Sequence, residues 1–321
     1  MGAIGGLFSV LNQQKWKIVF TVFMTSVFYF MLFPFSDLTD FVSNTIAKQT
    51  QNQVQLTMDS MGLSILPPGL ALENAQVEIG SFAPLKAQRL ALTPSPTGLI
   101  HQKPYGTFEA KGLFRGNAKI SVSAGKKSDG GVNREKIEMK AQKLSLSDLK
   151  DFLRLPVSIR GSADLLSSSQ VDLSWNEQPE SELQILIEKF ELPPASVPTS
   201  FGPIALPEIN LSQVDLKGRL AAGRFIIEKG QIGKDTDDFS GSIRGKMDMA
   251  LRNAGDGTPV PVFGAYDLEF DLLVKPAFET KAALFLSFIA AHKTPSTQGS
   301  RYRFKVTGMQ WGAPPDISTV R

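Results

Sequence analysis

Apolar and polar residues alternate along much of this 321-residue chain, and this period of two limits its fold more than any other feature. Between Asp238 and Arg252 the odd positions are apolar or glycine, whereas almost all even positions are polar. Successive side chains of a β-strand point to opposite faces of its sheet, so the stretch predicts a strand with one buried face. The residues expected on the apolar face of the sheet are Phe239, Ile243, Met247, Met249, Leu268 and Phe270.

The same alternation recurs between residues 118 and 306, interrupted by short segments that contain glycine or proline. Strands joined by such turns are typical of an antiparallel sheet with one apolar face. Helix signals are few, and the clearest lie at residues 145–155 and 277–293. The chain is therefore predicted to be mainly β, with a long antiparallel sheet that is curved or rolled and a few short helices.

An apolar sheet face has to be covered by a second sheet, by helices or by a bound molecule. Because few helices are expected, two arrangements remain open. In one, the sheet closes into a sandwich or roll that is filled by its own side chains. In the other, the apolar face holds a phospholipid or another lipid.

The composition excludes several kinds of chemistry. The absence of cysteine removes disulfides, thiol catalysis and cysteine-based metal sites. The two histidines, His101 and His292, are far apart in the sequence and leave little material for a zinc site or a catalytic triad. The formal net charge is only +3, and no dense basic run with interleaved aromatic residues occurs, so no nucleic-acid partner is expected.

The segment QIGKDTDDFSGSIRGKMDMAL, residues 231–251, combines glycines, a Gly-Lys pair and clustered aspartates. A Walker A loop needs four residues between its glycines, but three separate Gly241 from Gly245, and no hydroxyl residue follows the lysine. An EF-hand loop starting at Asp235 lacks the required glycine and glutamate. We therefore interpret residues 234–238 as a solvated turn. We expect no catalytic residue, no metal site, no cofactor and no enzymatic activity.

The N-terminus carries a targeting signal. No residue from 18 to 35 is charged, and a helix of this length spans about 27 Å. Lysines precede the apolar run and aspartates follow it, so the positive-inside tendency keeps the N-terminus in the cytoplasm and exports the rest. A cleaved signal peptide is the alternative, although no small-residue cleavage site follows. The residues expected in the membrane anchor are Trp16, Ile18, Phe20, Phe23, Phe28, Tyr29 and Phe33.

Several segments resemble a known family. The N-terminal anchor, the β-rich remainder and LSLSDLKDFLRLPVSIRGSADL at residues 144–165 resemble the type II secretion system protein N family and the related AsmA-like proteins. Residues 201–251 resemble the central repeat of type II secretion protein N. The segment GSRYRFKVTGMQWGAPPDI at residues 299–317 is similar to the closing strand of that group.

The resemblance implies a single-pass inner-membrane protein whose bulk lies in the periplasm. It implies a non-catalytic accessory component of a type II protein secretion system, with a periplasmic β domain that contacts other subunits. The AsmA-like relatives imply instead a lipid-binding or lipid-transfer protein of the cell envelope, with an AsmA-like or sandwich-like sheet.

The expected division of the chain follows from the anchor and from a proline-rich stretch that cannot be a regular central strand. It comprises a cytoplasmic N-terminus at 1–17, a transmembrane anchor at 18–35, a first periplasmic β subunit at 36–192, a proline-rich seam at 193–209, and a second periplasmic β subunit with a C-terminal helix and closing strands at 210–321.

Overall fold

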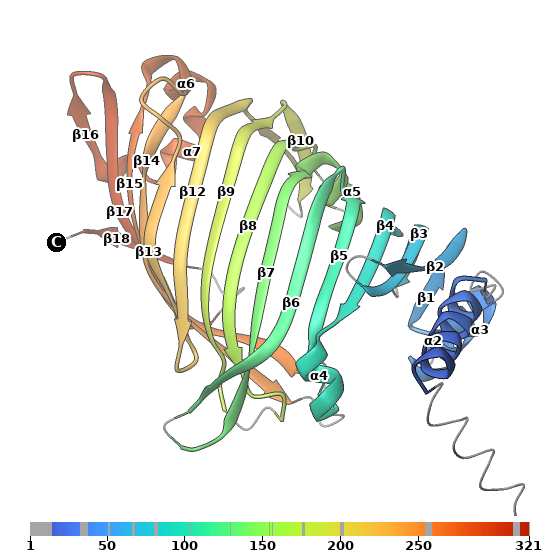
Figure 1. Ribbon diagram of the computed structural model, residues 1–321. Helices are drawn as coiled ribbons and strands as arrows, with labels where there is room; N and C mark the ends of the chain where they lie inside the picture. Colours follow the sequence, from blue (N-terminus) through green and yellow to red (C-terminus); the bar gives the residue numbers. More distant parts are fainter. Residues whose placement is uncertain are drawn as a thin grey trace, which may run out of the picture.

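A computed structural model shows a mainly β protein built around one large antiparallel sheet, which confirms the predicted fold class at that level (Figure 1). The structure describes residues 15–32, 38–50, 52–65, 68–79, 83–103, 105–128, 130–153, 155, 157–174, 177–199, 202–253, 259–310 and 315–320.

The sheet contains 16 strands, and their order along it is β1-β3-β4-β5-β6-β7-β8-β9-β12-β13-β14-β15-β17-β16, with β2 paired to β3 and β18 paired to β17. Its strands are β1 (Val54–Thr57), β2 (Ser60–Ile65), β3 (Pro68–Ile79), β4 (Leu85–Pro94), β5 (Gly106–Leu113), β6 (Gly116–Lys127), β7 (Asn133–Ser145), β8 (Arg160–Val171), β9 (Glu180–Leu192), β12 (Ile209–Ala221), β13 (Arg224–Ile232), β14 (Phe239–Asn253), β15 (Pro259–Val274), β16 (Lys293–Ser296), β17 (Gly299–Gly308) and β18 (Asp316–Thr319).

Tight turns explain why neighbouring strands in the sequence are neighbours in the sheet. Phe114 and Arg115 join β5 to β6 with φ angles of 48° and 61°, and Ala222 and Gly223 join β12 to β13 with φ angles of 48° and 72°. Positive φ at both turn positions is typical of a type I′ turn, whose twist matches that of the flanking strands.

The proline-rich segment leaves the large sheet and returns to it. It forms a separate two-stranded hairpin of β10 (Ala195–Thr199) and β11 (Gly202–Leu206), the only other sheet among the described residues. The strands on either side of it, β9 and β12, are hydrogen-bonded to each other from Leu192 and Ile209 onward. The large sheet is therefore continuous across the predicted seam at 193–209.

The sheet is strongly curved. In Figure 1 the lower ends of β14 and β15 pass behind the lower ends of β6 to β9. The side chain of Gln178, in the β8–β9 connection, both donates to the carbonyl oxygen of Leu251 and accepts from its N–H, each at 2.9 Å. Register shifts in several strand pairs add local bends to the strands. The curl brings β14 next to the β8–β9 connection, although β9, β12 and β13 precede β14 in the order of the sheet.

The helices are short, apart from α2. They are α2 (Lys15–Leu32), α3 (Thr39–Gln49), α4 (Pro96–His101), α5 (Leu146–Leu153), α6 (Pro276–Lys281), α7 (Ala283–Ser287) and the 3₁₀ helix η2 (Ala290–His292). The helix predicted at 145–155 corresponds to α5. The single helix predicted at 277–293 is instead divided among α6, α7 and η2, because the chain turns at the buried Ala282 and again at Phe288 and Ile289.

The predicted anchor lies partly within α2. Phe20, Phe23 and Phe28 of this helix are exposed, as is Trp16, whereas Phe33 lies outside the described residues. Ile18 and Tyr29 belong to the same helix. None of the described helices is both long enough and apolar enough to cross a bilayer.

The close approach of β15 explains why β14 has glycine at positions 241 and 245. A Cβ atom added at Gly241 would lie 2.3 Å from the carbonyl oxygen of Asp271, and one at Gly245 would lie 2.1 Å from that of Asp267. Gly245 also has a φ of +146°, which residues with side chains rarely adopt. These glycines therefore make room for the neighbouring strand rather than for an opposite wall or a ligand.

We expect Gly245→Ala to destabilise the protein by about 1–3 kcal/mol, because the new methyl group meets backbone atoms in a conformation that disfavours it. Thermal unfolding of the purified protein measures the change. Gly62→Ala is the matched control, since a Cβ atom at Gly62 in β2 meets no atom within 4 Å. Equal melting temperatures for the two variants would contradict this account.

Candidate functional site

Hydrogen-bonded pairing places a continuous series of apolar residues on one face of the sheet, which we call the apolar face. Residues paired across antiparallel strands share a face, so the series can be followed from strand to strand. One row consists of Leu72, Leu90, Ala110, Ala118, Ala141, Leu165, Ile185 and Leu216. The adjacent row consists of Leu63, Leu70, Leu92, Phe108, Ile120, Met139, Ser167 and Leu183.

Part of the apolar face is open to solvent. Leu92 is 51% exposed and its cross-strand neighbour Phe108 is 38% exposed, and the same row continues through the exposed Leu70 and Leu63. These four large side chains are consecutive partners on β2 to β5. Contiguous exposed apolar residues of this kind are typical of a surface that binds something.

Helices cover the apolar face at its C-terminal end. Phe278 and Ala282 of the α6–α7 segment pack with Val274, Tyr302 and Phe304 of β15 and β17 in a buried cluster. Leu286 and Ile289, farther along the same segment, pack against this cluster. We call α6, α7 and η2 together the helical cap.

The structure places the six predicted apolar-face residues on β14 and β15, where all are partly buried. Ile243 pairs with Phe270, Leu268 pairs with a glycine, and the rings of Phe270 and Phe304 stack with centroids 5.1 Å apart. Phe239 and Phe270 lie against the cluster under the helical cap. Met247 pairs with Tyr266, and Met249 pairs with Phe263 after a register shift.

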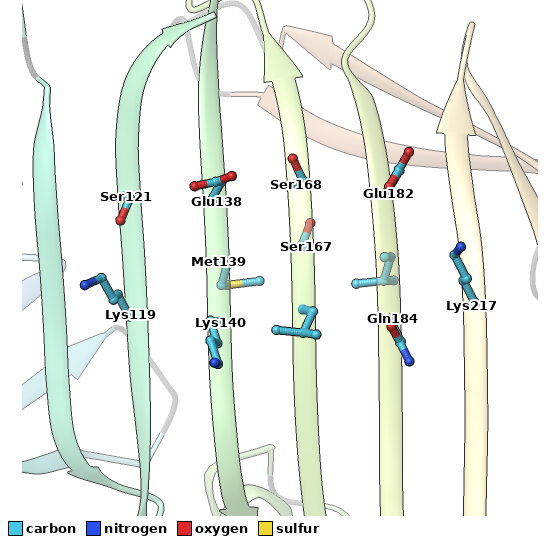
Figure 2. A pocket seen from close by; sticks show the side chains of 12 residues that line it. Lys119, Ser121, Glu138, Met139, Lys140, Ser167, Ser168, Glu182, Gln184 and Lys217 are labelled. Carbon is cyan, nitrogen blue, oxygen red and sulfur yellow. The ribbon is translucent and has the colours of Figure 1, made fainter.

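The opposite, polar face carries cross-strand ion pairs. Examples are Lys119 with Glu109 at 2.8 Å and Lys305 with Asp267 at 2.9 Å. Figure 2 shows a hollow on this face, over β6 to β9 and β12. Lysines, glutamates and serines line it around Leu166, which is 44% exposed. Its mixed charges are typical of a solvated face and indicate no particular ligand.

Four polar residues interrupt the apolar face near the lower ends of β7, β8 and β9. Ser169 of β8 pairs with Ser181 of β9, and Ser167 pairs with Leu183. On its other side Ser169 pairs with Ile137 of β7, and Glu135, two residues before Ile137, pairs with Val171. We call these four residues the polar island. Its hydroxyl oxygens are close together, with 2.7 Å between Ser169 and Ser181 and 3.3 Å between Ser167 and Ser181.

Sequence reasoning missed the polar island, although a signal for it exists. Glu135 is at an odd-numbered position of its strand, as are the apolar Ile137 and Met139. Ser167 and Ser169 are likewise two and four residues after Leu165, so the alternation places them on the same face. A polar residue at a position where the alternation predicts an apolar one is the sequence signal for the polar island. The pairing of Ser169 with Ser181, however, depends on strand register, which the sequence alone does not give.

The aspartate cluster at residues 234–238 forms a turn, as interpreted from the sequence. One carboxylate oxygen of Asp237 accepts hydrogen bonds at 2.8 Å from the backbone N–H groups of Ser212 and Lys234 and from the Ser212 hydroxyl. Burial alone would raise the pKa of Asp237, but these hydrogen bonds lower it on balance. In the described part of the chain, no three acidic or histidine side chains are grouped as metal ligands.

A polar cluster fastens the helical cap to the sheet. The Glu279 carboxylate accepts hydrogen bonds from Lys293, from Ser300 at 2.7 Å and from the buried Tyr302 hydroxyl at 3.3 Å. The hydrogen bonds from Lys293 and then Ser300 lower the pKa of Glu279. Burial, followed by the nearby Glu279 charge, raises the pKa of Tyr302.

No family model, no curated protein and no solved structure matches the chain.

We expect Glu279→Gln to destabilise the protein by about 1–2 kcal/mol at neutral pH, because a charged acceptor of several hydrogen bonds is lost. A carboxylate whose pKa is lowered by folding contributes its full stability above the ordinary glutamate pKa of 4.5 and loses it as the pH falls through the folded value. Wild type and variant should therefore converge in melting temperature as the pH falls below 4.5 and through the lowered pKa of Glu279.

The control is Glu188→Gln, which removes an exposed carboxylate from β9. Its melting temperature should follow that of the wild type at each pH. A difference between wild type and Glu279→Gln that persists unchanged in acid would refute the assigned role of the carboxylate.

Proposed function

We propose that this protein is a non-catalytic binding protein of the cell envelope, and that the apolar face of its sheet holds the acyl chains of lipids. One observation carries the proposal: a single curved sheet has a long apolar face, and the helical cap packs only on its C-terminal end. Of the two arrangements expected from the sequence, a face that holds a ligand agrees better with this geometry than a closed sandwich.

The energetics support the same function. Removing apolar area from water contributes about 25 cal/mol per Å². Exposure of Leu92 and Phe108 is therefore unfavourable, and contact with acyl chains would lower this free energy. Acyl chains are flexible and unselective partners, and they suit a wide surface of leucine, isoleucine, alanine and methionine side chains. The polar face, with its cross-strand ion pairs, suits contact with water.

We further propose the location given by the sequence. The segment at 18–35 anchors the chain in the inner membrane, the N-terminus stays in the cytoplasm, and the sheet lies in the periplasm. Exposed aromatic side chains on α2, among them Phe20, Phe23 and Phe28, favour contact with a bilayer. An AsmA-like architecture, in which a membrane anchor precedes a curved sheet, is part of this proposal.

A second candidate function is that of an accessory component in a type II secretion system. The two ends of the sheet favour it, because the short strands β1, β2, β16 and β18 are at the edges. Edge strands present unpaired N–H and C=O groups, to which a partner protein can add a strand. Site-specific cross-links from β16 or β18 to secretion subunits in cells would support this function over lipid binding.

We expect the purified protein to retain phospholipid that organic extraction and mass spectrometry detect. Leu92→Asp and Phe108→Asp should each reduce the retained lipid several-fold, because a carboxylate on the apolar face repels acyl chains. Leu166→Asp is the matched control, since this leucine is similarly exposed but lies on the polar face. Lipid-free wild-type protein, or equal losses in all three variants, would rule out the proposed function.

We expect alkaline phosphatase fused after Arg321 to be active in cells, because the enzyme folds only when exported. The same fusion placed directly after Lys15, before the apolar run, should be inactive. An inactive fusion at Arg321 would rule out the periplasmic location while leaving lipid binding open.

A further inference from the structure

The polar island is unusual because it lies among apolar residues on the face that we propose to hold acyl chains. Ile137 pairs with Ser169, Met139 pairs with Ser167, and Val171 pairs with Glu135. Serine hydroxyls can hydrogen-bond to one another across strands, and Ser169 and Ser181 do so at 2.7 Å. Such a pair would by itself be an ordinary feature of a sheet.

The carboxylate of Glu135 is the second observation and is not ordinary. Glu135 is only 6% exposed, and its cross-strand partners are Ala124 and Val171. Within the described part of the chain, no hydrogen bond or ion pair reaches its carboxylate. Glu135 is not among the residues whose polar side-chain atoms are fully buried without a partner, so its carboxylate oxygens remain accessible from the apolar face. A cation with N–H donors could pair with this carboxylate at that face.

The two basic residues that flank Glu135 in the sequence are already engaged. Lys136 forms an ion pair with Glu138 on the polar face. Arg134 precedes Glu135 and therefore points to the opposite face of the strand. Its guanidinium binds Glu177 at 2.8 Å and Glu180 at 2.9 Å. Both hydrogen bonds raise the pKa of Arg134, that with Glu180 contributing more. Arg134 therefore leaves Glu135 unpaired.

The curl of the sheet lies beside this end of the apolar face. Ser181 is the second residue of β9 and Val171 is the last residue of β8, so the polar island borders the β8–β9 connection. Gln178 of that connection holds β14 through Leu251. In Figure 1 the lower ends of β14 and β15 pass behind this region. The polar island thus lies at the end of the apolar face where the sheet folds back.

We propose that the polar island binds the headgroup of an aminophospholipid, such as phosphatidylethanolamine. The primary ammonium donates to Glu135. Within the Ser169–Ser181 pair one hydroxyl donates to the other, so Ser167 and the remaining hydroxyl of that pair donate to a phosphate oxygen. The acyl chains then extend along the apolar residues of the same strands, including Met139 and Leu183. This inference rests on the proposed function and adds the class of lipid.

The chemistry of the polar island discriminates among common phospholipids. Phosphatidylglycerol brings a negative phosphate next to Glu135 without a cation to balance it. The quaternary ammonium of phosphatidylcholine has no N–H donor, so it cannot hydrogen-bond to the carboxylate. Phosphatidylethanolamine alone among the three offers both an ammonium donor and a phosphate acceptor.

The test uses the full-length protein, delipidated in detergent and incubated with vesicles of equal parts phosphatidylethanolamine, phosphatidylglycerol and phosphatidylcholine. The protein is recovered and its bound lipids are quantified by mass spectrometry. Wild type should be enriched in phosphatidylethanolamine. Glu135→Gln should lower the enrichment roughly tenfold, the effect of losing one charge-assisted hydrogen bond. The double variant Ser169→Ala/Ser181→Ala, which removes both partners of one hydrogen bond, should lower it in the same direction.

Two matched controls come from the polar face of the same strands. Glu138→Gln and Ser168→Ala make the same chemical changes within three residues of the polar island, on the side that faces away from it. Both should retain the wild-type enrichment. Lipid bound by wild type in the proportions of the vesicle, or enrichment kept by Glu135→Gln, would overturn the headgroup site and leave acyl-chain binding standing. Absence of any bound lipid in the wild type would overturn the proposed function itself, and the headgroup site with it.

Discussion

The rest of the structure depends on how a single apolar sheet face is kept from water. A sandwich solves this problem with a second sheet, but the described residues contain only one other, the β10–β11 hairpin. The chain uses two other means of cover. The helical cap packs on β15 and β17, and the curl of the sheet, held at Gln178 and Leu251, brings distant strands toward one another. Both act on parts of the apolar face, and the exposed row from Leu63 to Phe108 is left to solvent or to a ligand.

Much of this architecture could be predicted from the period-two alternation. The strand expected between Asp238 and Arg252 corresponds to β14. The alternation also predicts Ile243 and Phe270 on the apolar face, and the structure shows them as cross-strand partners. The alternation predicts the face of each side chain reliably, because successive side chains of a strand point to opposite faces whichever strands become its neighbours. The glycines of β14 also lie on the expected face. They admit the backbone of β15, a close approach that only the assembled sheet makes visible.

Other features depend on contacts that the sequence does not display. Phe114 has no obvious turn signal, yet it adopts a φ of 48° between β5 and β6. Its carbonyl oxygen accepts a hydrogen bond from the Ser145 N–H at 2.8 Å, and its ring contacts that of Phe152 at 5.6 Å. Tertiary contacts thus stabilise a conformation that local propensity disfavours. The division of the helical cap at Ala282 and the register that forms the polar island have the same origin.

The order of the strands has a consequence for how such a sheet comes into existence. From β3 to β9 and from β12 to β15, each strand of the large sheet lies next to the strand made just before it. Between these two runs, β10 and β11 form a hairpin that pairs with itself. At the ends of the sheet β3 pairs with both β1 and β2, and β17 lies between β15 and β16. Within those two runs, pairing closes mostly short loops, which keeps its entropic cost low. A chain that emerges N-terminus first can add most strands one at a time to the growing edge of the sheet. Until β16 and β18 are added, that edge is unfinished, and an interrupted chain would end in an exposed strand wherever it stopped.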